Sequence, residues 1–130
     1  MALNDILNSN VKQANHDAAT QRQLEAEKKQ RELKEQFQRG VSNANKAIAG
    51  ITAKMEEASK KGLRIHTEDI YQWSRDYGMD EYDRGYTSTL IAHFKNENIR
   101  GELRDSSMEP CGSDPLFDYT VYSLYLDFTW

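Results

Sequence analysis

Polar side chains that could contact a nucleic acid or a protein gather between residues 84 and 104. Side chains of these types donate hydrogen bonds to phosphates and base edges, and Tyr and Arg are enriched at protein interfaces. The candidates for partner or nucleic-acid binding are Arg84, Tyr86, Ser88, Thr89, His93, Lys95, Asn96, Arg100 and Arg104. Just before them, a candidate acidic surface for binding a basic protein consists of Asp80, Glu81, Tyr82 and Asp83.

Catalytic chemistry has few candidates in this chain. The three histidines are far apart in the sequence, at His16, His66 and His93. A calcium loop counted from Asp80 would place the apolar Ile91 where a bidentate glutamate is required. Cys111 follows Glu109, whose charge disfavours a thiolate. We therefore expect a protein that is not an enzyme and that uses no metal, no cofactor and no small-molecule substrate.

Residues 67–98 are expected to form two helices joined by a turn. Thr67 suits an N-cap, and Ile70, Trp73 and Tyr77 would share one face of the first helix, which Gly78 would end. Among the aromatic residues of this stretch, Trp73 and Tyr77 are expected in the core.

The second part of this stretch begins at Asp80, which can cap a short helical turn. Gly85 is expected to break that turn, and a second full helix would run from about Tyr86 to Asn98. Tyr82 and Tyr86 are the aromatic residues that we expect to be exposed.

Alternating apolar and polar residues on either side of the helices indicate strands. Short strands are expected at residues 63–66 and 99–104, followed by a loop from Asp105 to Asp118 that contains two prolines. A last strand would cover residues 119–130, with inward side chains at Tyr122, Leu124, Leu126, Phe128 and Trp130. The pattern predicts an α+β head with a two- to three-stranded antiparallel sheet and the element order of a winged helix.

Residues 1–61 are expected to form a helical arm for oligomerisation, preceding the head of residues 62–130. The arm has no proline from Leu3 to Ala58 and is rich in good helix formers. Apolar residues recur at steps of three and four, as in a coiled-coil seam. The proposed seam comprises Phe37, Val41, Ile48, Ile51 and Met55, with Ala44 and Ala58 in the same phase, and a shorter seam comprises Leu7, Val11, Ala14 and Ala18.

Gly40 leaves two arrangements of the arm open. A glycine in a helix interior costs about 1 kcal/mol relative to alanine, so Gly40 could end one helix, with Ser42 capping the next in a hairpin. Because the heptad phase continues from Phe37 through Gly40 without a slip, we favour one continuous helix. An isolated helix cannot bury its seam, so the arm predicts a partner helix, most simply a second copy in a homodimer or a higher homo-oligomer.

The charges are divided unevenly along the chain. Residues 1–61 hold eleven Lys/Arg and eight Asp/Glu, whereas residues 62–130 hold six Lys/Arg and thirteen Asp/Glu, a net charge of −7. Phosphate neutralisation dominates affinity for DNA, so an acidic head opposes DNA binding and favours a protein partner. The chain contains no apolar run of the length that crosses a membrane and no recognisable signal peptide at its first residues, so we expect a cytoplasmic protein without membrane contact.

Four sequence runs carry a resemblance to a known family. TEDIYQW, GYTSTLIAHFK, NIRGELRDSS and VYSLYL resemble the winged helix-turn-helix proteins of bacteriophages and prophages. The resemblance covers about residues 63–130. It implies that the helix from Ser88 to Asn96 occupies the position that reads a DNA major groove, and that Asp105 to Asp118 form a wing.

Three functions remain open at this point. The first is a phage-type winged-helix protein that oligomerises through its arm and binds a macromolecular partner, with DNA as one candidate. The second is an acidic inhibitor or adaptor, of an anti-defence or DNA-mimicking kind, that binds a host protein in the host cytoplasm. The third is a structural or scaffold component of a virion.

Overall fold

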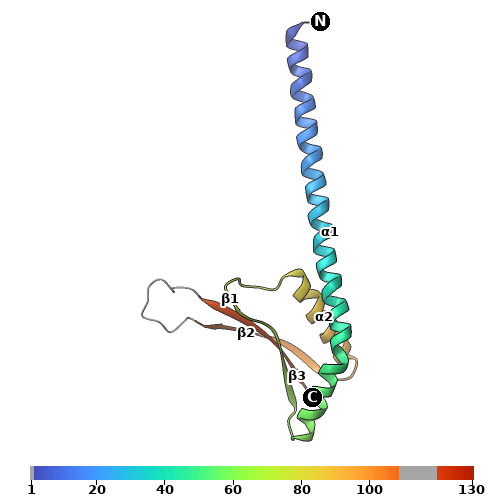
Figure 1. Cartoon of the computed structure of the whole chain (residues 1–130), viewed down its shortest axis with the longest axis vertical. Helices are drawn as coiled ribbons and strands as arrows, with labels where there is room; N and C mark the ends of the chain where they lie inside the picture. The colour runs from blue at the N-terminus through green and yellow to red at the C-terminus, as the bar shows by residue number, and fades with distance from the viewer. Residues whose placement is uncertain (1, 109–119) are drawn as a thin grey trace, which may run out of the picture. The chain divides into compact units, whose positions relative to one another are not determined.

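The computed structural model describes residues 2–108 and 120–130. Within these residues the order of elements is α1 (Leu3–Lys60), β1 (Ile65–Ser74), α2 (Glu81–Lys95), β2 (Arg100–Met108) and β3 (Val121–Thr129) (Figure 1). This confirms the predicted α+β class, the long first helix and the antiparallel sheet. The chain divides into two compact units, an N-terminal unit of residues 1–35 and a C-terminal unit of residues 36–130.

The first helix is continuous through Gly40 and Gly50, so the hairpin alternative is wrong. In the N-terminal unit every described residue is exposed. From Phe37 onward, α1 has buried or half-buried residues at helical spacing, and the buried ones are Gly40, Ala44, Ile51 and Met55.

The later seam of α1 packs inside its own chain. Ala44, Ile51 and Met55 share a core with Leu90 and Phe94 of α2 and with Leu126 and Phe128 of β3, and Ile48 packs against it. A heptad stripe identifies the apolar face of a helix but does not say what covers that face. The predicted boundary at residues 61 and 62 therefore cuts through the core, whereas the compact units meet at residues 35 and 36.

Two glycines allow α1 and α2 to lie side by side (Figure 1). A Cβ on Gly40 would clash with the carbonyl oxygen of Tyr82 and lie 2.8 Å from the amide nitrogen of Tyr86. A Cβ on Gly85 would clash in the same way with the carbonyl oxygen of Phe37. The prediction that Gly85 breaks a helix is wrong, because α2 runs from Glu81 to Lys95 without interruption. This glycine provides close approach instead of a helix end.

The sheet has the strand order β1-β3-β2, with both pairs antiparallel. Residues directly opposite each other share a face. One face carries Leu124, Leu126 and Phe128 of β3, all buried toward the helices. As predicted, these residues point inward, while Tyr122 and Trp130 are half-buried. The opposite face is polar, with Thr67, Arg104 and Asp127 among its residues.

The prediction of a first helix in the helix-turn-helix is wrong, because residues 65–74 form strand β1. Thr67 to Asp127 and Glu68 to Leu126 are register pairs in the antiparallel ladder with β3. The N-cap signal at Thr67 competed with a composition rich in β-branched and aromatic residues, and pairing with β3 decided in favour of the strand. A helix-turn-helix is therefore not formed between Thr67 and Asn98.

The prediction that a loop begins at Asp105 is wrong. Strand β2 continues to Met108, and its pairing with β3 extends to Met108 opposite Val121. Asp105 therefore lies in a strand. The remainder of the predicted wing, with Cys111, lies outside the described residues.

Candidate functional site

Four of the predicted partner-binding residues share the exposed surface of α2. All four are exposed; Arg84, Ser88 and Lys95 lie at helical spacing on one face of α2, and Asn96 is the residue that caps its C-terminus. Thr89 and His93 are half-buried, and the His93 ring lies edge-on to Phe94 at 4.9 Å. The structure thus forms a polar helical surface from part of the predicted set.

Arg100 and Arg104 do not join this helical surface. They belong to β2, whose even-numbered residues face away from the helices, and Arg100 pairs with Glu102. The guanidinium of Arg104 donates to both carboxylate oxygens of Asp127, at 2.9 and 3.4 Å, and lies 4.6 Å from the centre of the Tyr125 ring. The hydrogen bond from Arg104 lowers the pKa of Asp127, and the hydroxyl of Thr67 adds to this effect.

The predicted acidic surface forms the N-terminus of α2, where it makes local contacts. The carboxylate of Asp80 accepts a hydrogen bond from the amide of Asp83 at 2.8 Å, which confirms the predicted cap. Glu81 pairs with Arg84 at 3.5 Å. Burial raises the pKa of Asp83, and the charge of Asp80 raises it further. These carboxylates therefore stabilise the helix terminus, whatever else they bind.

Tyr82 and Tyr86 are half-buried, so the prediction that they are exposed is wrong. Their rings stack with centroids 6.2 Å apart, and the amide of Asn43 donates to the Tyr82 hydroxyl at 2.7 Å. Tyr86 packs against the core, and burial raises its pKa, followed by the charges of Glu68 and Tyr82. Both tyrosines belong to the contact between α1 and α2.

Among the described residues, the exposed aromatic side chains are those of Trp73 and Tyr77, which the sequence placed in the core. Their exposed fractions are 60% and 73%. The prediction failed because it assumed a helix, in which these two positions would face inward with Ile70. In the structure Tyr77 lies edge-on to Tyr122 at 5.3 Å, and Ile70 alone of the predicted face packs against the core.

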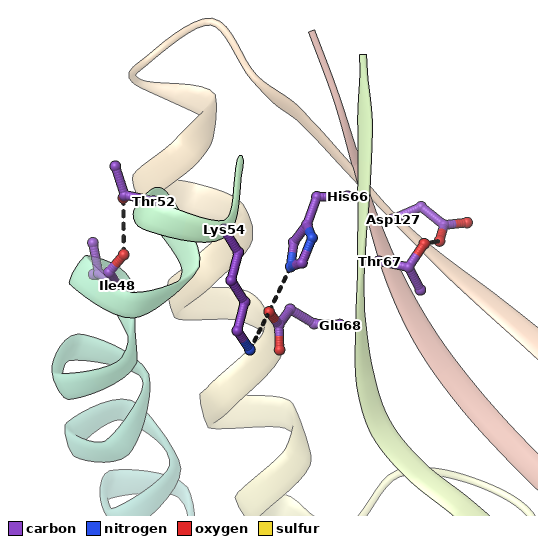
Figure 2. A network of polar contacts seen from close by, with 7 residues as sticks. All are labelled: Ile48, Thr52, Lys54, His66, Thr67, Glu68 and Asp127. Carbon is purple, nitrogen blue, oxygen red and sulfur yellow. Dashed lines mark hydrogen bonds and ion pairs between the residues drawn. The ribbon is translucent and has the colours of Figure 1, made fainter. Parts of the chain in front are cut away.

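A polar network between α1 and β1 was not predicted. The imidazole Nε2 of His66 lies 2.6 Å from Glu68 Oε1, and the Lys54 ammonium reaches the same oxygen at 3.4 Å (Figure 2). His66 and Glu68 are two residues apart on one strand, so their side chains share a face. They lie opposite Phe128 and Leu126, whose side chains point toward the helices. A prediction of residues 65–69 as a strand would have placed His66 and Glu68 on the same face. The contact of Lys54 with Glu68 links β1 to α1.

An open pocket of about 410 Å³ lies between the C-terminal turns of the two helices. Its lining includes Met55, Phe94, Ile99 and Trp130, with His93 at its side. Among the described residues no group of three His, Cys, Asp or Glu side chains is arranged to hold a metal ion. Neither described helix has the length and apolar composition needed to cross a membrane.

Comparisons with protein-family models, with curated proteins and with solved structures find no match to this chain.

Proposed function

We propose that this chain is a self-assembling binding protein whose N-terminal unit associates with the same unit of a second copy. The observation that carries this proposal is the exposure of an apolar stripe on a regular helix. Leu3, Leu7 and Val11 are 69%, 52% and 58% exposed, and Leu7 and Val11 continue at steps of three and four to Ala14 and Ala18. Helices gain most of their stability from packing an apolar face, so we expect this stripe to pack against a partner.

A second copy fits this stripe by its chemistry. Residues 1–35 hold six Lys/Arg and six Asp/Glu, so two copies do not bring net charge together. Small alanines at positions 14 and 18 permit close approach of a second helix. The later seam is already covered by α2 and β3, whereas the first stripe remains exposed and available to pair between chains.

Light scattering on the full chain tests this assembly. Replacing Leu7→Asp together with Val11→Asp places two charges in the stripe and should lower the mass to that of a smaller assembly. Asn8→Asp with Asn15→Asp adds the same charge beside the stripe and should leave the mass unchanged. Equal masses for both variants, or a monomeric wild type at about 100 μM, would contradict the proposal.

Recognition of DNA by α2 is a second candidate. It is favoured by the exposed surface of Arg84, Ser88, Lys95 and Asn96, and by the antiparallel pair β2 and β3 that follows the helix. The net charge of −7 over residues 62–130 opposes it. Fluorescence anisotropy with a random duplex at low salt tests the candidate. Binding that weakens about tenfold in Arg84→Ala with Lys95→Ala would support it, and no binding at tens of micromolar protein would remove it.

A further inference from the structure

Strand β2 has a long free edge. Its nine residues pair with β3 in an unbroken register, from Arg100 opposite Thr129 to Met108 opposite Val121. No described strand pairs with its other edge, and every residue of β2 except the half-buried Gly101 is exposed. A regular edge of this length presents unpaired backbone groups that accept another strand.

The charges on β2 are complementary to themselves in one register. Arg100, Glu102 and Arg104 alternate along the face that points away from the helices. When two copies of β2 pair antiparallel with Leu103 at the centre, Glu102 of each lies opposite Arg104 of the other. A two-fold axis normal to the sheet requires one residue to lie opposite its own copy. Among the other registers of this kind that pair more than half of the strand, those centred on Glu102, Arg104 or Asp105 place like charges opposite each other, and the one centred on Ser106 matches no opposite charges. Opposite charges across a strand pair are stabilising and like charges are destabilising.

The same register also fits the side of the strand that faces the helices. It places Asp105 of one copy opposite Gly101 of the other. Gly101 has no side chain and lines a pocket of about 420 Å³ together with Ile91 and Lys95. Among the described residues Lys95 makes no ion pair. The pocket can therefore receive the Asp105 carboxylate beside a free ammonium, and Leu103, which is 40% exposed, meets its own copy.

We propose that the edge of β2 is a symmetric interface, at which two copies of this chain join their sheets into one six-stranded sheet centred on Leu103. The contact is isologous, as expected for a two-fold dimer. The interface contains no residue of the N-terminal unit, so it can be tested independently of the assembly proposed for that unit.

Disulfide trapping in the full chain tests the register. In a Cys111→Ser background, Leu103→Cys places two thiols directly opposite each other, with Cα atoms about 4.5–5.5 Å apart, a separation that a disulfide spans. Ser106→Cys is the matched control, because the two Ser106 positions lie about 20 Å apart in this register. Mild oxidation should cross-link Leu103→Cys and leave Ser106→Cys monomeric on a non-reducing gel. Equal cross-linking of both, or of neither, would overturn the proposal.

Charge exchange provides a second and independent readout. Glu102→Arg alone and Arg104→Glu alone each oppose like charges, and each should lower self-association about tenfold. An equimolar mixture of the two variants restores both opposite-charge pairs, so a heterodimer should form at wild-type strength. Glu97→Arg, a reversal of an exposed glutamate outside β2, should change nothing. Failure of the mixture to associate, with both variants folded by circular dichroism, would count against the interface.

The trapping experiment also separates the two proposed assemblies. Repeated in the Leu7→Asp and Val11→Asp background, Leu103→Cys should still cross-link if the edge of β2 is the interface. Loss of cross-linking in that background would show that the thiols meet only because the N-terminal units hold the chains together, and would overturn the edge proposal while supporting the other.

Discussion

At the scale of single residues, the polar face of the sheet is organised around Asp127. Its carboxylate accepts hydrogen bonds from the Thr67 hydroxyl at 2.6 Å and from the Arg104 guanidinium, and so joins all three strands. The hydrogen bond from Arg104 keeps the pKa of Asp127 below its ordinary value of 3.8. A carboxylate with a lowered pKa stabilises the fold most when it is ionised.

Replacing Asp127→Asn tests this role through the pH dependence of stability. The contribution of the carboxylate is fully present above pH 3.8 and is lost as the pH falls through the lowered pKa. The wild type should therefore be the more stable protein near pH 7, and the difference should shrink as the pH falls below 3.8. Urea unfolding of both proteins across this range measures the difference. A gap that stays constant down to the acid end would contradict the assignment.

At the scale of elements, the crossing of α1 and α2 depends on backbone contact through Gly40 and Gly85. Each glycine faces main-chain atoms of the other helix, and these cannot move aside as a flexible side chain can. The contact explains why Tyr82 and Tyr86 are held at the crossing, where Asn43 satisfies the Tyr82 hydroxyl. Each helix therefore contains a glycine, a residue of low helix propensity, at the position where the other helix packs most closely.

Alanine substitutions separate packing from helix propensity. Gly40→Ala and Gly85→Ala should each destabilise the protein by about 1–3 kcal/mol, because the added methyl forces the helices apart. Gly50→Ala in the same helix, where a Cβ would meet nothing within 4 Å, should stabilise it by about 0.5–1 kcal/mol. Chemical denaturation of the three variants gives the free energies. A stabilising Gly40→Ala would show that the helices do not approach closely.

At the scale of the whole molecule, the C-terminal unit takes part of its core from α1. Ala44, Ile51 and Met55 supply the side of that core opposite β3. Residues 1–35 contribute no buried residue among those described. The unit that folds cooperatively should therefore begin near residue 36.

Two truncations test that boundary. A chain beginning at residue 36 should keep cooperative unfolding with a midpoint within a few degrees of the full-length value. A chain beginning at residue 62 should fail to fold, because it loses buried Ile51 and Met55, each of which costs about 2–5 kcal/mol when its side chain is removed. Thermal unfolding followed by circular dichroism compares them. A folded chain of residues 62–130 would restore the boundary that the sequence predicted.

Local patterns were sufficient for several elements. Good helix formers without proline predicted α1, the alternation from Tyr122 to Trp130 predicted β3, and Asp80 was recognised as a cap. Part of the candidate surface on α2 also followed from helical spacing. In these places the neighbouring residues along the chain settle the conformation.

Residues whose conformation depends on distant partners could not be predicted in the same way. Thr67, Glu68 and Asp69 suit a helix start, but β3 pairs with them as a strand, and this pairing turns Trp73 and Tyr77 outward. The network of His66, Glu68 and Lys54 exists only because that strand lies against α1.

The polar residues between positions 84 and 104 show the same division. The sequence by itself determined which side chains could bind a partner and that several of them would lie on one helix. Only the tertiary structure decided that Arg104 donates hydrogen bonds to Asp127 and that Tyr86 packs against the core. It also decided which residues remain exposed, namely Arg84, Ser88, Lys95 and Asn96. The reason is physical: residue type and spacing fix a side chain's chemistry and its face, whereas the packing of distant segments fixes what covers that face.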